Sequence, residues 1–220
     1  MINEQREFWS KVADNYDCVV DLQIGGQTRR MVQERLDREA ALGSTVEFGC
    51  GSGFYTETLA DKADRLMATD LSPGMLDLAR SRVGAANVTF QPEDCQRTSF
   101  PDGSFDAAFM GLVIHFTEPG KALKEMHRIL RPGGTLIIAN LDLPALQGLD
   151  RLRCLARILY QGLVGYRTKP PKGLGRNMLS EKQLCKLLRE FGFDVSSSEA
   201  VKDSSRSSNI PIEYVKARKL

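Results

Sequence analysis

The chain has 220 residues, of which 42% are hydrophobic and 26% are charged, and its 30 Lys and Arg against 28 Asp and Glu leave a formal charge of +2. This length suits one domain with an insertion, or two domains at most, and allows a self-sufficient core. So small a net charge provides no electrostatic footprint for DNA, RNA or an anionic membrane, so we expect no nucleic-acid partner and no stable membrane association.

The cysteine pattern and the N-terminus predict a cytoplasmic protein. The five cysteines are scattered, odd in number and without a C-x-x-C pair. Such a pattern favours reduced thiols over a disulfide or zinc framework, and no metal site is expected. Residues 1–7 are charged where a signal peptide would be apolar, and the most apolar run, 107–116, is too short to span a bilayer.

The first two thirds of the chain alternate helical and strand patterns. Amphipathic helices are predicted at residues 4–16 and 28–42, and Gly43 ends the second. Strands are then predicted at 45–49, 65–70, 88–91, 107–112 and 135–141, with helices at 55–60, 72–83 and 118–129 between them. Ser72 and Pro73 form a helix start, with an N-cap followed by a proline at the first helical position. This alternation implies right-handed crossovers and a parallel sheet with helices on both faces.

Residues 143–179 interrupt the alternation and are interpreted as a helical insertion that forms a lid over the edge of the sheet. Residues 144–166 have a helical pattern, and 168–176 are rich in Pro, Lys and Gly. Arg151, Arg153 and Arg157 stand between the apolar positions of this helix. Their basic face is either simply solvated or a site for an anion or a membrane surface, and both interpretations stay open.

The end of the chain completes the predicted sheet. A helix at 180–191 with Ser180 as its N-cap precedes strands at 193–201 and 212–219. If these pair as an antiparallel hairpin, the sheet has seven strands, mostly parallel with the last one antiparallel. We therefore expect one doubly wound α/β domain, made of N-terminal helices (1–43), a cofactor-binding core (44–142), the lid insertion (143–179) and a C-terminal helix and strand hairpin (180–220).

A glycine loop directly after the first strand is the sharpest signal for a ligand. Gly49, Gly51 and Gly53 lie at a strand–helix junction, where glycine lets the backbone turn tightly and approach a ligand that a Cβ would exclude. Asp70 ends the next strand, and in dinucleotide-binding folds an acid in that place accepts hydrogen bonds from the ribose hydroxyls. A glycine pair alone is also common in purely structural turns, but together with the acid it predicts a nucleotide site.

Two residues of the loop bear on which nucleotide binds. The dinucleotide fingerprint G-x-G-x-x-G would require a third glycine at position 54, where this chain has Phe54. The carboxylate of Glu47 would repel a pyrophosphate but would suit a ligand with an ammonium group. The loop therefore favours a nucleoside that bears an amino acid over NAD.

In combination these motifs resemble the class I S-adenosylmethionine-dependent methyltransferases, and in detail the methyltransferase domain 11 group related to ubiquinone and menaquinone C-methyltransferases. Segments 90–95, 100–106 and 130–136 match further signatures of that family. The resemblance implies a Rossmann-like fold, S-adenosylmethionine as cofactor with S-adenosylhomocysteine as product, and methyl transfer to a small-molecule acceptor. An RNA or protein methyltransferase, or a non-catalytic cofactor-binding protein, is the alternative, and a homodimer is possible.

The resemblance also implies a set of cofactor-binding residues. In the family the glycine loop lies under the methionine part of the cofactor, the acid at Asp70 holds the ribose, Leu71 and Met75 pack the adenine, and Asp94 takes the adenine amino group. Segment 8–17 resembles a family helix whose tyrosine, here Tyr16, closes over the cofactor carboxylate; simple packing is the alternative for Tyr16. The full expected set is Tyr16, Glu47, Gly49, Cys50, Gly51, Gly53, Asp70, Leu71, Met75, Asp94, Cys95 and Gly111, with Cys50 as a small loop residue and not a nucleophile.

Methyl transfer requires few catalytic side chains. The protein aligns donor and acceptor about 3 Å apart and excludes water, and orientation of this kind contributes roughly 7–11 kcal/mol. A base is needed only where the acceptor must first lose a proton. His115 follows the fourth strand at the carboxyl edge, where open α/β sheets bind ligands, and is the expected catalytic residue. A buried histidine bonded to backbone is the alternative.

Overall fold

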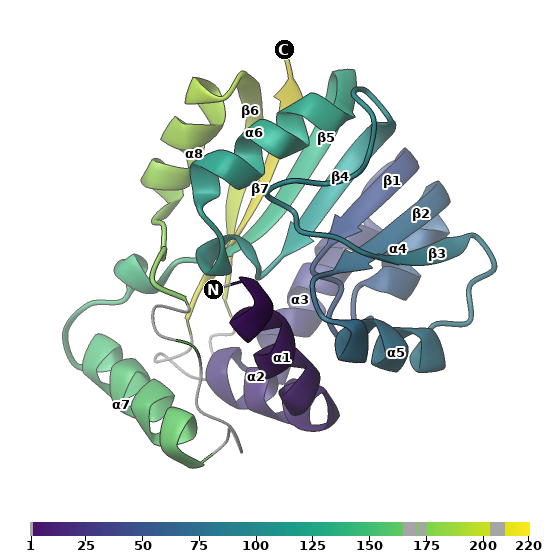
Figure 1. Cartoon of the computed structure of the whole chain (residues 1–220). Coiled ribbons are helices and arrows are strands. Elements are labelled where there is room, and N and C mark those ends of the chain that lie inside the picture. The colour runs from purple at the N-terminus through teal and green to yellow at the C-terminus, as the bar shows by residue number, and fades with distance from the viewer. Residues whose placement is uncertain (1, 165–170, 172–174, 203–209) are drawn as a thin grey trace.

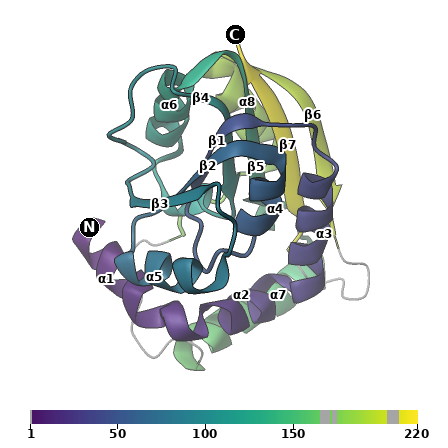
Figure 2. The ribbon, with the colours of Figure 1, turned by 90° about the vertical axis from the view of Figure 1, so that its right-hand side faces the viewer.

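Seven strands form one mixed sheet in the computed structural model, which describes residues 2–164, 171, 175–202 and 210–220. The strand order is β3-β2-β1-β4-β5-β7-β6 (Figures 1 and 2). The strands are β1 (Gly43–Phe48), β2 (Ala63–Asp70), β3 (Val88–Pro92), β4 (Phe105–Gly111), β5 (Leu130–Leu141), β6 (Phe193–Val201) and β7 (Ile212–Lys219). Strands β1 to β5 pair in parallel, and β7 is antiparallel to both β5 and β6. The predicted mostly parallel seven-stranded sheet is confirmed.

The strand order places a ligand crevice between β1 and β4. From β1 the chain first builds outward through β2 and β3, and then crosses back to build β4 and β5 on the other side. Ligands of open α/β sheets bind outside the carboxyl ends of the strands at this point of reversal. The glycine loop after β1 and the carboxyl end of β4 therefore face one another across the crevice.

Eight helices surround the sheet in the part of the chain that the structure describes. They are α1 (Ile2–Val12), α2 (Tyr16–Ile24), α3 (Gly26–Asp37), α4 (Thr56–Lys62), α5 (Pro73–Arg82), α6 (Pro119–Ile129), α7 (Gly148–Val164) and α8 (Glu181–Glu190), with short 3₁₀ turns η1 (Ala13–Asn15), η2 (Ile114–Phe116) and η3 (Leu143–Ala145). None of the helices in the described ranges is long and apolar enough to cross a membrane. The Pro, Lys and Gly rich loop predicted at 168–176 falls outside the described residues except at 171, 175 and 176.

Buried apolar residues form a cluster on each face of the sheet. Successive residues Ile137 and Ile138 of β5 are both fully buried, but they belong to opposite clusters, as expected where side chains alternate along a strand. Leu36 of α3 packs in the cluster that contains Ile137, and Leu123 of α6 packs in the other. The two-sided covering that the alternation predicts is thus present.

The N-terminal region differs from the sequence expectation. Three helices form where two were predicted, because the chain breaks at η1 and again at Gly25, whose φ of 87° ends α2. Helix α2 has no clear one-sided pattern, since its apolar residues Val19, Val20, Leu22 and Ile24 are spread over more than half of the helix circumference. Figure 1 shows α1, α2 and α7 grouped at one end of the sheet, with the C-terminus at the other end.

The start of β5 also differs. This strand begins at Leu130, five residues before the predicted start at residue 135, and it includes the Pro132-Gly133-Gly134 turn sequence. A register shift between Phe105 and Ala107 of β4 accommodates the irregular start. The helix ends at α6 and α8 agree with prediction, and Ser180 forms a capping box with Gln183.

Candidate functional site

The glycine loop is held between two other segments of the chain. Gly49 has a φ of +65°, and a Cβ placed on it would lie 2.4 Å from Cγ2 of Val113, which follows β4. Gly51 has a φ of +54°, and a Cβ on it would lie 3.2 Å from the ring of Tyr16 on α2. Only glycine combines this backbone conformation with so close an approach. The loop therefore presents bare backbone to the crevice.

Asp70 ties the loop to the start of α5. Its Oδ2 accepts a hydrogen bond from the backbone N–H of Gly51, and its Oδ1 accepts one from the backbone N–H of Ser72, both at 2.9 Å. Burial raises the pKa of Asp70 to about 6, while these backbone donors lower it. Each oxygen keeps a second lone pair, so the carboxylate can accept further hydrogen bonds from a ligand.

A pocket opens between the loop, Asp70 and the N-terminal helices. Eight of the twelve expected cofactor-binding residues line it: Tyr16, Gly49, Gly51, Asp70, Leu71, Met75, Asp94 and Cys95. The lining is completed by residues of α1 and of the segments after β3 and β4: Ile2, Gln5, Trp9, Glu93, Gln96, Leu112, Val113, Phe116 and Thr117. The structure thus brings together residues from five separate stretches of the chain.

The other four expected residues do not line the pocket. Glu47 is 1% exposed, and its Oε2 accepts a hydrogen bond from Oγ1 of Thr56 on α4 at 2.7 Å. Burial raises the pKa of Glu47 to about 8, so the group holds a proton at neutral pH. Cys50 is buried and its thiol pKa is raised, which suits a small loop residue. Neither Gly53 nor Gly111 lines the pocket.

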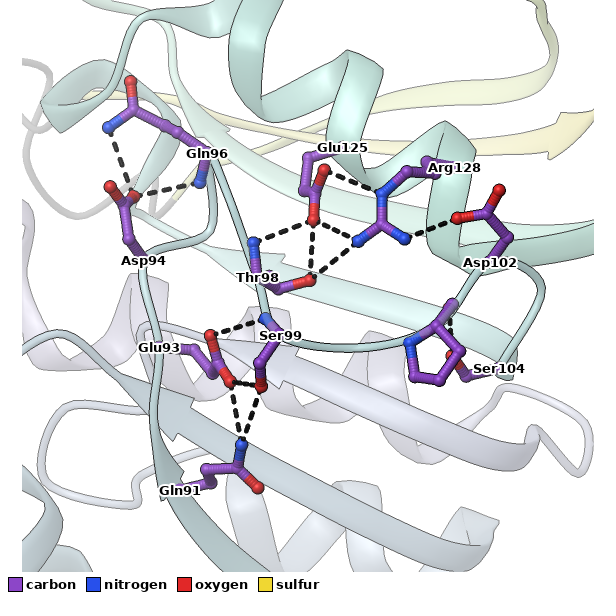
Figure 3. Close-up of polar contacts among 11 residues, drawn as sticks. Gln91, Glu93, Asp94, Gln96, Thr98, Ser99, Asp102, Ser104, Glu125 and Arg128 are labelled. Atoms are coloured by element: carbon purple, nitrogen blue, oxygen red, sulfur yellow. Dashed lines mark hydrogen bonds and ion pairs between the residues drawn. The ribbon is translucent and has the colours of Figure 1, made fainter.

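Helix α6 braces the wall that carries Asp94 (Figure 3). Oδ1 of Asp94 accepts hydrogen bonds from the backbone N–H of Gln96 at 2.9 Å and from its amide at 3.3 Å. Further along, Thr98 donates to Oε1 of Glu125 through its backbone N–H at 2.8 Å and through its hydroxyl at 2.6 Å. Burial opposes ionisation of Glu125, but the hydrogen bonds from Arg128 and Thr98 lower its pKa to about 2. A charged pair on α6 therefore fixes the loop.

His115 lies next to the pocket but not on its surface. It is 3% exposed in η2, and its ring centroid is 3.9 Å from that of Phe116, which does line the pocket. Nδ1 has no hydrogen-bond partner among the described residues. Burial lowers the pKa of His115 to about 3, so the imidazole is neutral in the physiological range.

The far end of the insertion contacts the segment that carries His115. The backbone N–H of Asn177 donates to the carbonyl oxygen of His115 at 3.4 Å, and the Asn177 amide donates to the carbonyl oxygen of Thr117 at 2.5 Å. The amide of Asn140, at the end of β5, donates to the carbonyl oxygen of Leu179 at 2.8 Å. Asn177 is therefore joined to the pocket rim at Thr117, and Leu179 is joined to the end of β5.

Asp17 connects the N-terminal helices to the glycine loop, a role that sequence reasoning missed. Its Oδ1 accepts hydrogen bonds from the hydroxyl of Ser52 at 2.7 Å and from Arg29 at 3.0 Å, and Oδ2 pairs with Arg82 of α5. Burial raises the pKa of Asp17, but these hydrogen bonds outweigh it and bring the pKa below the usual value. In the sequence, the position of Asp17 directly after Tyr16 is the signal that could have indicated this role.

Comparisons with known proteins agree with this geometry. Residues 46–138 match a family model described as a methyltransferase domain. The malonyl-(acyl-carrier protein) O-methyltransferase of Serratia marcescens is 33% identical over 148 residues, which cover 64% of this chain and 54% of that protein. The demethylmenaquinone methyltransferase of Paenarthrobacter aurescens is 34% identical over 145 residues, which cover 64% of this chain and 56% of that protein. The chain spans about half the length of these curated relatives.

Solved structures share the fold. An S-adenosylmethionine dependent methyltransferase from Mesorhizobium loti superposes with a TM-score of 0.67 and 20% identity, covering 88% of this chain and 99% of that chain. The cyclase SpnF superposes with a TM-score of 0.69 and 19% identity, covering 97% of this chain and 94% of that chain. At these identities the likeness concerns the fold alone. Residues 46–138 thus match the methyltransferase domain model, and the sheet that carries them has the fold of these structures.

Proposed function

We propose that this chain binds S-adenosylmethionine in the pocket and transfers its methyl group to a small-molecule acceptor. The observation that carries the proposal is the hydrogen bond between the Gly51 N–H and Asp70, which joins the glycine loop and the acid of the neighbouring strand in one pocket. The match of residues 46–138 to the methyltransferase domain supports it. S-adenosylhomocysteine would be the product.

The lining residues receive proposed roles in holding the cofactor. Asp70 accepts hydrogen bonds from the ribose hydroxyls with its remaining lone pairs. Leu71 and Met75 pack against the adenine. Asp94 takes the adenine amino group with Oδ2, because Oδ1 is occupied by Gln96. Tyr16 covers the cofactor carboxylate from α2. Glu47, Cys50, Gly53, Cys95 and Gly111 act through the shape of the backbone or through the wall behind it.

The acceptor is proposed to approach from the side of η2 and residues 143–179. These residues would act as a lid within the four-part domain described above, and the hydrogen bonds from Asn177 to η2 support that role. Bound cofactor supplies an electrophilic methyl on a sulfonium, with a neutral thioether as leaving group. The rings of Trp9 and Phe116, 5.0 Å apart, help to exclude water. His115 would accept a proton only from an acceptor that must lose one.

The acceptor class is part of the proposal. One relative is named for malonyl-(acyl-carrier protein) and the other for demethylmenaquinone, and both are about equally similar to this chain. All five cysteines are free, which supports a cytoplasmic site of action. The homodimer stays a prediction.

Cofactor binding is tested by calorimetry with S-adenosylmethionine, S-adenosylhomocysteine and NAD. The unmodified chain should bind the first two and not NAD. Leu71→Trp fills the space proposed for adenine and should abolish binding. Leu187→Trp changes a half-buried leucine of α8 outside the pocket and should leave binding intact. Binding of NAD, or full cofactor affinity in Leu71→Trp, would refute the assignment.

A cofactor-binding protein that performs no methyl transfer is the alternative that the sequence left open. Incubation with methyl-labelled cofactor and an acceptor library separates the two. Methyl transfer adds the mass of one CH₂ unit to an acceptor and yields S-adenosylhomocysteine in equal amount. Tight cofactor binding without S-adenosylhomocysteine formation would favour the alternative.

A further inference from the structure

Helix α7 exposes an apolar stripe. Leu149, Leu152 and Leu159 are 68%, 63% and 69% exposed, and Ala156 between them is exposed as well. At about 100° per residue, these four positions fall within about 80° of one another around the helix. Cys154, which is fully buried in the core, lies nearly opposite. Helix α7 therefore attaches to the molecule by one side and turns a second apolar side outward.

Most of the exposed large apolar residues lie at the same end of the molecule. In the described ranges they are Ile2, Leu149, Leu152, Leu159 and Leu220. Three belong to α7, and Ile2 belongs to α1 and lines the pocket. Figure 1 shows α1 and α7 at one end of the sheet and the C-terminus at the other end. Leu220 is the C-terminal residue and therefore lies apart from the other four. Scattered apolar residues need no explanation, but a grouped set marks an interaction surface.

Positive charge is concentrated in the same part of the sequence. Residues 148–176 contain seven of the 30 Lys and Arg but one of the 28 Asp and Glu, so the rest of the chain is net acidic. Arg151 and Arg153 of α7 are exposed, and Arg153 lies 3.7 Å from Asp150 in a pair that is open to solvent. The small net charge of the whole chain conceals this local excess.

We propose that the α7 surface, formed by Leu149, Leu152, Leu159, Arg151 and Arg153, docks reversibly on a membrane that contains anionic lipids. A basic amphipathic helix lies in the bilayer interface with its apolar side in the boundary between headgroups and acyl chains, and its cations contact anionic headgroups. A second copy of this chain is a poorer occupant, because pairing two α7 surfaces would bring their arginines together.

Docking through α7 would also orient the pocket. Helix α7 contacts α2, which carries Tyr16 at the pocket wall. Figure 2 shows α2 and α7 side by side along the edge of the molecule. The consequence, which rests on the proposed function, is that a methyl acceptor dissolved in the lipid would enter beside α7. Reversible docking of this kind differs from the stable membrane association that the sequence analysis does not expect.

Vesicle flotation of the whole chain tests the docking surface. Vesicles of phosphatidylcholine with phosphatidylglycerol should bind the chain, and vesicles of phosphatidylcholine alone should bind it at least tenfold more weakly. Arg151→Glu with Arg153→Glu should weaken binding at least tenfold, since each basic residue near an anionic surface contributes about fivefold. Leu149→Ser, Leu152→Ser and Leu159→Ser in one variant should weaken it to a similar extent.

Matched controls lie elsewhere on the surface. Leu220→Ser and Arg189→Glu change an exposed leucine and an exposed arginine outside α7, and both should bind vesicles like the unmodified chain. Cofactor affinity and melting temperature, measured without vesicles, should be unchanged in all variants, so a failure of docking is distinct from a failure of the proposed function. Equal binding to both kinds of vesicle, or undiminished binding in the α7 variants, would overturn the proposal. A change from dimer to monomer in the serine variant would overturn it too, because α7 would then be a self-interface.

Discussion

The carboxylate of Asp70 holds two backbone N–H groups and, in the proposed function, a ribose as well. Asp70→Ala should reduce affinity for S-adenosylmethionine about tenfold to a hundredfold, since a charge-assisted hydrogen bond contributes roughly 1.5–3 kcal/mol. Calorimetry measures this loss. Asp77→Ala, at an exposed position of α5 outside the pocket, is the control and should bind normally. Unchanged affinity in Asp70→Ala would exclude a role at the ribose.

Glu47 predicts a dependence of stability on pH. Burial raises its folded pKa from 4.5 to about 8, against the lowering effect of Thr56. Between these two pH values Glu47 is ionised in the unfolded chain but keeps its proton in the folded chain. The stability that Glu47 contributes is therefore complete below pH 4.5 and is lost as the pH rises through 8.

Glu47→Gln removes this titration. The free energy of unfolding of the unmodified chain should fall relative to that of the variant by on the order of 2–4 kcal/mol as the pH rises through this window. Denaturant unfolding at a series of pH values measures the difference. A difference that does not change with pH would show that Glu47 is ionised in the folded protein.

His115 is tested by its effect on turnover. If it accepts a proton from the acceptor, His115→Ala should lower kcat roughly 10²–10⁴-fold with nearly normal cofactor affinity. Because burial lowers the pKa of His115 to about 3, a plot of kcat against pH should show no change near pH 6.5 from protonation of this histidine. His127→Ala, on α6 outside the pocket, is the control and should retain kcat. A lower melting temperature with normal kcat would make His115 a structural residue.

At the scale of elements, the site depends on how α2 is fastened to the glycine loop. Asp17→Asn weakens the contacts with Ser52, Arg29 and Arg82, and the N-terminal helices should then open more often. We expect roughly fivefold to tenfold weaker cofactor binding and faster hydrogen exchange in α1 and α2, with the sheet unaffected. Loss of both cofactor affinity and protection from hydrogen exchange is expected if Asp17 positions α2 against the glycine loop.

Asp21→Asn is the matched control for this prediction. Asp21 lies on the same helix and also pairs with Arg29, at 2.9 Å, but none of its hydrogen bonds within the described residues reaches the glycine loop, and its side chain is more exposed than that of Asp17. It should leave cofactor affinity within about twofold, since exposed ion pairs contribute little. Equal loss in both variants would mean that the stability of α2, and not its tie to the loop, controls binding.

At the scale of the whole molecule, the pocket joins α1, α2 and the ends of several strands, so ligand binding should stabilise the entire fold. At a hundredfold excess over Kd, binding contributes about 2.7 kcal/mol. In a chain of this size S-adenosylmethionine should raise Tm by roughly 5–10 °C. Thermal denaturation measures the shift; NAD at the same concentration should produce none, and a shift with NAD would contradict the choice of nucleotide.

The sequence by itself determined the architecture and the meeting of the glycine loop with Asp70. Alternating apolar runs and helical patterns are local, and they predicted the strands and the two-sided sheet. Gly49, Gly51 and Asp70 were recognisable because the motif that brings them together is short, and sheet pairing of neighbouring strands makes their meeting almost automatic.

Only the tertiary structure decided which way side chains point and which distant segments meet. Glu47 turns toward Thr56 and not into the pocket, because alternation along β1 places it on the face that α4 covers. Asp17 reaches Ser52, and Asn177 reaches His115, across 35 and 62 positions of the chain. Contacts of this kind leave no periodic trace in the sequence, because they depend on how packed elements are placed and not on any local pattern.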